Sequence, residues 1–100
     1  MLKLNHKQLA VWDKSLHLVK EVYKLTSRLP NEEKYVLTSQ LRRASISVAS
    51  NIAEGAARKS IIERRRFYEV SRSSSVEIDT QIEICKLLEY FQEIDLQNLD

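Results

Sequence analysis

Glycine, proline and cysteine are almost missing from this chain, since each occurs once among its 100 residues. Glycine and proline are the residues that most often interrupt regular structure and form tight turns. Their scarcity excludes a turn-rich β-sheet protein and favours long, uninterrupted helices. The single glycine, Gly55, also excludes a glycine-rich loop of the kind that holds phosphates.

The lone cysteine, Cys85, excludes an internal disulfide and a zinc site built from several thiolates. Unpaired cysteine is typical of a reducing compartment, so we expect a cytoplasmic protein. No apolar run approaches the roughly 20 residues that span a membrane, and the N-terminus lacks the apolar centre of a signal peptide. The sequence therefore predicts no membrane partner.

The apolar residues recur at spacings of three and four, which is the period of one face of an α-helix. Helices are predicted over residues 6–28, 38–57 and 61–90. A fourth helix is predicted to begin near residue 96, where Asp95 is suited to the N-cap, and it is truncated or only begun. We therefore expect one domain over residues 1–100, an all-α, up-down antiparallel helical bundle with apolar surface left uncovered. Either the chain is truncated, or a partner subunit fills the gap.

The second of these helices, from Leu37 to Gly55, has almost no charged side and is predicted to be buried from two directions. A helical wheel places small or apolar residues on the side opposite its main apolar face. This small-residue face consists of Ile46, Ala49 and Ala53. Between the two faces lies a polar strip made of Gln40, Arg43, Ser47, Asn51 and Glu54.

The polar strip has two interpretations. It is either a site for a phosphate or a base, or a hydrogen-bond network that fixes helix register at an interface. The second interpretation is favoured, because buried polar groups must find partners whatever the protein does. Both sets of residues on this helix are candidates for an interface.

Basic residues gather at the start of the third predicted helix, although the net charge of the chain is only +2. The candidates for nucleic-acid contact are Arg58, Lys59, Arg64, Arg65 and Arg66. Phosphate backbones attract such clusters, and a helix N-terminus adds a favourable dipole. Consecutive helical residues point about 100° apart, so only some of the five can face one ligand. A mixed solvated surface and head-to-tail association are the alternatives.

Residues suited to catalysis or metal binding are not brought together by the pattern. Nucleophilic catalysis needs a base beside a serine or cysteine, and the only histidines are His6 and His17. Cys85 falls on an inferred core face, as a small apolar group would. Asp13, His17 and Glu21 share a helix side, but a solvated row of side-chain pairs is the ordinary explanation. We expect no enzyme, no catalytic residue, no metal site and no cofactor.

The stretch LTSQLRRASISVASNIAEG, at residues 37–55, resembles a known family. These are the small four-helix-bundle proteins encoded in intervening sequences of bacterial 23S ribosomal RNA genes, a family that includes the accessory protein of diversity-generating retroelements. The resemblance covers roughly residues 9–90. Its other matching residues are Leu9, Val11, Trp12, the Leu29–Pro30 corner, Phe67, Ser73, Ser74 and Glu77.

The resemblance implies an up-down four-helix bundle that assembles as a ring, typically a pentamer, without catalytic activity. The retroelement relatives are strongly basic, bind nucleic acid and serve a reverse transcriptase. This chain differs from them in its mild net charge and in the short start of its fourth helix.

Two hypotheses follow. The first is a non-enzymatic helical-bundle protein that self-associates and acts as an adaptor or accessory, with RNA, DNA or a nucleic-acid enzyme as partner. The alternative is a protein–protein interaction module with no nucleic-acid role, which the acidic last quarter of the chain favours.

Overall fold

The computed structural model describes residues 5–99, with the side chains at positions 5, 8, 93 and 94 left out, and all regular structure in that range is helical. The long helices are α1 (Ala10–Thr26), α2 (Leu37–Ala57) and α3 (Ile61–Leu87). The short 3-10 helices are η1 (Asn5–Gln8), η2 (Asn31–Glu33) and η3 (Glu93–Leu99). No helix in the described range is long and apolar enough to cross a membrane.

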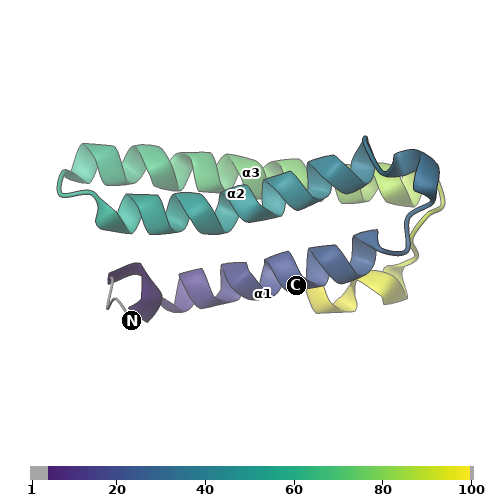
Figure 1. The fold of residues 1–100 in the computed structure, drawn as a ribbon, viewed down its shortest axis with the longest axis horizontal. Coiled ribbons are helices and arrows are strands. Elements are labelled where there is room, and N and C mark those ends of the chain that lie inside the picture. The colour runs from purple at the N-terminus through teal and green to yellow at the C-terminus, as the bar shows by residue number, and fades with distance from the viewer. Residues whose placement is uncertain (1–4, 100) are drawn as a thin grey trace.

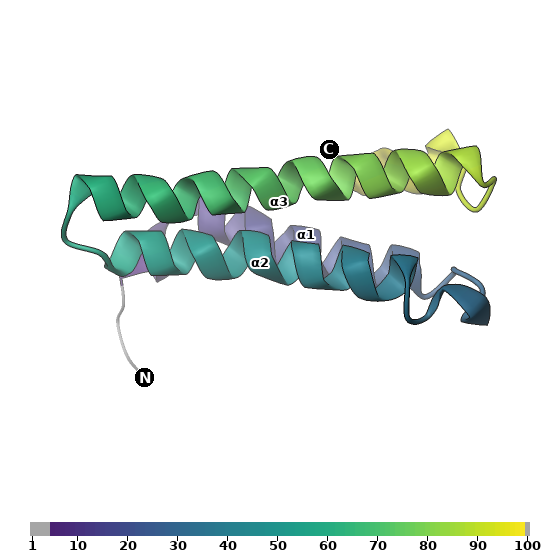
Figure 2. The same cartoon turned by 90° about the horizontal axis from the view of Figure 1, so that it is seen from above.

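The helices form an elongated body of 44 × 26 × 22 Å in which α2 is central. In Figure 1 the chain runs to the right along α1, back along α2 and to the right again along α3, and η3 then turns back beside α1. Both α1 and α3 pack against α2, but they do not pack against each other. Figure 2 shows α2 and α3 side by side with α1 behind them. The predicted all-α class is confirmed.

The core forms where the apolar faces of the long helices meet. Leu41 and Cys85 are completely buried, and Val22 is 1% exposed. The apolar surface of α1 is only partly covered, because α1 packs on α2 and on the short helices η1 and η3 but not closely on α3. Val11 and Leu16 on that helix remain 53% and 42% exposed.

The first and third helices are shorter than predicted. α1 begins at Ala10 rather than at residue 6, because Leu9 has an extended backbone that separates η1 from it. α3 ends at Leu87 rather than at residue 90. There Glu89 adopts a left-handed φ of 64°, and the Tyr90 amide donates to the carbonyl of Cys85 at 2.9 Å. This Schellman turn uses the last helical carbonyls and stops the helix.

Small side chains let α2 and α3 approach closely. The Ser71 hydroxyl donates to the carbonyl of Val48 at 2.9 Å, and the Ser74 hydroxyl donates to the hydroxyl oxygen of Ser47 at 2.8 Å. Ser71 and Ser74 are both buried. Both hydroxyls thus donate hydrogen bonds to acceptors on α2 instead of facing water.

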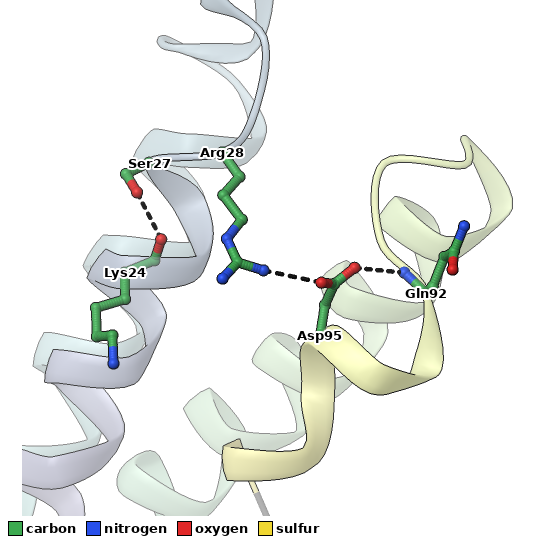
Figure 3. A network of polar contacts seen from close by, with 5 residues as sticks. All are labelled: Lys24, Ser27, Arg28, Gln92 and Asp95. Atoms are coloured by element: carbon green, nitrogen blue, oxygen red, sulfur yellow. Dashed lines mark hydrogen bonds and ion pairs between the residues drawn. The ribbon is translucent and has the colours of Figure 1, made fainter.

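The predicted start of a fourth helix forms the 3-10 helix η3, and Asp95 does not cap it. Asp95 lies inside η3, where its carboxylate accepts from the Gln92 amide at 2.9 Å and from Arg28 Nη1 at 2.8 Å (Figure 3). These bonds fasten η3 to the end of α1. Ile94 and Leu99 have the sequence spacing of a hydrophobic staple, and of this pair only the Leu99 side chain lies within the described residues.

Gly55 has a different role from the helix terminator that its position suggests. It lies within the last turn of α2, which continues to Ala57, and its φ is not positive. A Cβ atom at this position would lie 2.6 Å from Cε1 and 2.8 Å from Cδ1 of Tyr68. Gly55 is therefore needed for the close approach of the Tyr68 ring to α2.

A double-mutant cycle tests this contact. In a Tyr68→Ala background, Gly55→Ala should raise the free energy of unfolding by about 0.5–1 kcal/mol, because alanine favours the helix. In the native background the same change should lower it by about 1 kcal/mol, since the ring must move. Urea denaturation followed by circular dichroism measures both, and an equal effect in the two backgrounds would contradict the contact.

Candidate functional site

Three members of the polar strip lie along the contact between α2 and α3. The carboxamide oxygen of Gln40 accepts from Gln81 Nε2 at 3.1 Å. Asn51 Nδ2 donates to the carbonyl and hydroxyl oxygens of Ser47 at 2.8 and 3.0 Å. Ser47 in turn receives the hydroxyl of Ser74. Within one chain, these residues form a hydrogen-bonded seam between two helices.

The two charged members of the strip do not join this seam. Glu54 pairs with Arg58, one turn further along the chain, at 2.8 Å. Arg43 is exposed and makes no ion pair with any residue in the described range. The polar strip, which is continuous on a helical wheel, is therefore divided into three residues in the seam and two exposed charged residues, Arg43 and Glu54.

The small-residue face is covered unevenly. Ala49 is buried at 7% exposure, Ala53 is half-buried, and Ile46 is 45% exposed. The side of α2 that carries Ile46 continues through Ser50 and Ala57, which are both exposed. The burial predicted for this second face is therefore provided within the chain at Ala49, in part at Ala53, and not at Ile46.

Arg58 is held by its own surroundings. Its guanidinium pairs with Glu54 and lies 4.7 Å from the centre of the Phe67 ring. Its carbonyl accepts from Arg64 Nε at 2.6 Å. These contacts tie the short connection between α2 and α3, and they leave Arg58 and Arg64 less free to bind a ligand.

The other three cations are differently placed. Lys59, Arg65 and Arg66 are exposed and make no ion pair with the described residues. A hollow of about 340 Å³ lies beside Arg65, and it is also lined by Ile61, Tyr68, Glu69 and Arg72. None of these four residues was among the predicted contact residues, although all of them lie at helical spacing from Arg65. We call this end of the molecule the basic end, defined by Lys59, Arg65 and Arg66.

A second hollow, of about 900 Å³, lies between α1 and α3, and we call it the α1–α3 groove. Its floor includes Val48 and Ile52 of α2, and Leu99 of η3 closes one end. Sequence reasoning did not name these residues as a site. The sequence indicated this groove only indirectly, through the apolar surface that the predicted helices were expected to leave uncovered.

The nucleophilic and acidic groups of the interior are arranged for packing. Burial, with a smaller contribution from the negative charge of Glu33, raises the pKa of the Cys85 thiol to about 11. A thiol with such a pKa stays protonated at neutral pH and packs as a small apolar group. The Tyr90 hydroxyl donates to Glu33 at 2.9 Å, and this hydrogen bond is the main cause that raises its pKa.

The family model described as the 23S rRNA-intervening sequence protein matches residues 7–100. The chain belongs to this family. The match spans all three long helices and η3, and it confirms the family that the stretch at residues 37–55 predicts. None of the curated proteins matches the chain.

The seam makes a testable prediction about Gln81 in this family member. Gln81 is 5% exposed, and its Oε1 is buried without a hydrogen-bond partner. Gln81→Leu should leave the free energy of unfolding unchanged or raise it by up to about 1 kcal/mol, because an unpaired acceptor is removed. Ser71→Ala, the matched control, should lower it by about 1 kcal/mol.

Both variants are measured by chemical denaturation. A loss of more than about 2 kcal/mol in Gln81→Leu would contradict this prediction and would show that the bond to Gln40 stabilises the helix contact strongly.

Proposed function

We propose that this 23S rRNA-intervening sequence protein is a non-enzymatic helical bundle that self-associates and serves as an adaptor or accessory that binds RNA or DNA. One observation carries the proposal. The outer face of α2, made of Ile46, Ser50, Ala53 and Ala57, is solvent-accessible yet carries no charge. Exposed helix faces are normally charged or polar, and an apolar one of small residues suits the close packing of another helix.

The assembly that we propose is a closed ring of up-down four-helix bundles, typically a pentamer, as the family resemblance implies. An interface between different patches on neighbouring subunits generates a ring when the rotation between subunits closes. The outer face of α2 would supply one of the two patches. Arg43 lies beside this face without an ion pair in the described part of the chain, so it is available to a neighbouring subunit.

The basic end supports nucleic-acid binding. Lys59, Arg65 and Arg66 extend into solvent at the junction of α2 and α3, away from the acidic part of α3. Their charges would neutralise phosphates without regard to base sequence. A ring would repeat the basic end once per subunit, so that weak contacts act together along one nucleic acid.

A second candidate is a protein-interaction module with no nucleic-acid role. The exposed side chains of Glu77, Asp79 and Glu83 in the C-terminal half of α3 favour it, because they would repel phosphates. The two candidates differ in their response to RNA.

Assembly is tested with Ile46→Glu. Placing a carboxylate in an apolar interface leaves a buried, unpaired charge, so self-association should weaken about a hundredfold or more. Sedimentation velocity should show the native chain as an oligomer and the variant as a monomer with unchanged helicity. Val76→Glu is the matched control, because Val76 is 59% exposed on α3, and this variant should remain oligomeric. Native protein that sediments as a monomer would contradict the proposal.

Nucleic-acid binding is tested with Arg65→Glu/Arg66→Glu. We expect tight binding of a labelled RNA hairpin at 50 mM salt to be lost, and the slope of log affinity against log salt to fall by about 2. Lys20→Glu/Lys34→Glu makes the same change in net charge away from the basic end and should retain most of the affinity. Equal losses in both variants would contradict a localised site, and a native chain that does not bind RNA would favour the second candidate.

A further inference from the structure

Two neighbouring isoleucines in the first turn of α3 extend into solvent. Ile61 and Ile62 are 70% and 80% exposed, and neither belongs to the core cluster of the described residues. They follow the turn from α2 to α3, which lies at one end of the molecule (Figure 2). Single exposed aliphatic side chains are ordinary on protein surfaces, so the surroundings of these two decide what they can bind.

An arginine lies one helical turn beyond each isoleucine. Arg65 follows Ile61, and Arg66 follows Ile62, at the spacing that brings side chains on a helix side by side. At about 100° per residue the four side chains cover about 140° of the circumference of α3, so they share one side of the helix. Both arginines are exposed and make no ion pair in the described range. We call this surface the Ile–Arg patch, defined by Ile61, Ile62, Arg65 and Arg66.

The Ile–Arg patch occupies only the first two turns of α3. Glu69 lies on the same side, one turn beyond the arginines, and its carboxylate would repel phosphates. None of the four residues of the patch lines the α1–α3 groove. A helix seated in that groove would therefore leave this side of α3 accessible.

Contacts within the chain hold the patch in place. Arg64 Nε donates to the carbonyl of Arg58 at 2.6 Å, and the Ser60 hydroxyl accepts from the Glu63 amide at 3.3 Å. Isoleucine is itself stiff, because its branched Cβ restricts χ1. The aliphatic side chains are thus pre-organised, and little conformational entropy remains to be lost when they bind.

The patch suits an anionic partner that also offers apolar surface, and a nucleic acid fits better than a lipid membrane. The two isoleucine side chains together carry fewer carbons than one myristoyl chain, which by itself binds membranes only marginally. In a nucleic acid the phosphates supply the affinity through the arginines, so the aliphatic contact has to supply only selectivity. Isoleucine is also among the side chains that proteins insert between bases.

Insertion between bases favours one class of nucleic acid. Separating two stacked bases costs free energy, and this cost is smallest where an unpaired nucleotide already interrupts the stack. We infer that the Ile–Arg patch recognises a base-paired stem interrupted by an unpaired nucleotide, with isoleucine against the exposed base and arginine on the flanking phosphates. The inference rests on the nucleic-acid binding proposed above, and it names the class of nucleic acid that the basic end selects.

The probes are two fluorescein-labelled RNA stems of the same sequence, one fully paired and the other with an unpaired adenosine. Fluorescence anisotropy with the native chain should show about tenfold tighter binding of the interrupted stem, because its stack is already open. Equal affinity for the two stems would overturn the inference and leave the proposed nucleic-acid binding intact.

Substitution of the isoleucines separates selectivity from affinity. Ile61→Ser/Ile62→Ser should reduce the preference to about twofold or less and leave the affinity for the fully paired stem unchanged, because the phosphate contacts remain. Val76→Ser/Leu87→Ser is the matched control on the same helix, since these side chains are 59% and 80% exposed outside the patch, and it should keep the preference. A preference that survives in the isoleucine variant, or that both variants lose equally, would overturn the inference.

A fluorescent base reports the contact directly. 2-Aminopurine is placed beside the unpaired adenosine, and its fluorescence rises when it leaves the base stack. Saturation with the native chain should raise this fluorescence, whereas Ile61→Ser/Ile62→Ser should not. No rise with the native chain would overturn the inference.

Other occupants of the patch give different results. If the two stems bind alike and phosphatidylserine vesicles retain the native chain but not Ile61→Ser/Ile62→Ser, the patch binds membranes and the inference is overturned. If that variant dissolves the native oligomer, the isoleucines contact a neighbouring subunit and the inference is likewise overturned. Arg65→Glu/Arg66→Glu should weaken binding of both stems alike. A native chain that binds neither stem would contradict the proposed nucleic-acid binding itself, and the inference with it.

Discussion

The close contact between α2 and α3 is the constraint on which the other features depend. It requires small residues on both helices, because Tyr68 occupies the space of a Cβ at Gly55 and Ser71 reaches the backbone at Val48. Within it the Ser74 hydroxyl is paired with that of Ser47, whereas Gln81 Oε1 is buried without a partner. Serines that are weak helix formers in isolation therefore stabilise this pair of helices through packing.

This contact also decides what remains uncovered. Because α3 is committed to one side of α2 and α1 to another, the two outer helices do not meet. The space between them is the α1–α3 groove, and η3 closes one end of it. The side of α2 that faces neither helix is the outer face with Ile46. The described residues thus present two apolar surfaces, the concave α1–α3 groove and the convex outer face of α2.

The connection between α2 and α3 also determines which basic residues are held by contacts within the chain and which are exposed. Arg58 pairs with Glu54 and lies over the Phe67 ring, and Arg64 donates to the Arg58 carbonyl, so these two residues stabilise the turn. Lys59, Arg65 and Arg66 are left in solvent. A nucleic acid bound at this end would therefore meet three exposed positive charges close to the turn that Arg58 and Arg64 hold.

The sequence by itself determined the helical class, the three long helices and the family, because periodicity, the scarcity of glycine and proline, and the stretch at residues 37–55 are local properties of the chain. Only the tertiary structure decided that Gln40 pairs with Gln81, that Arg28 pairs with Asp95, and that the Tyr68 ring packs on Gly55. A helical wheel gives the direction of a side chain, whereas its burial and its partner depend on residues distant in sequence, which packing alone brings near.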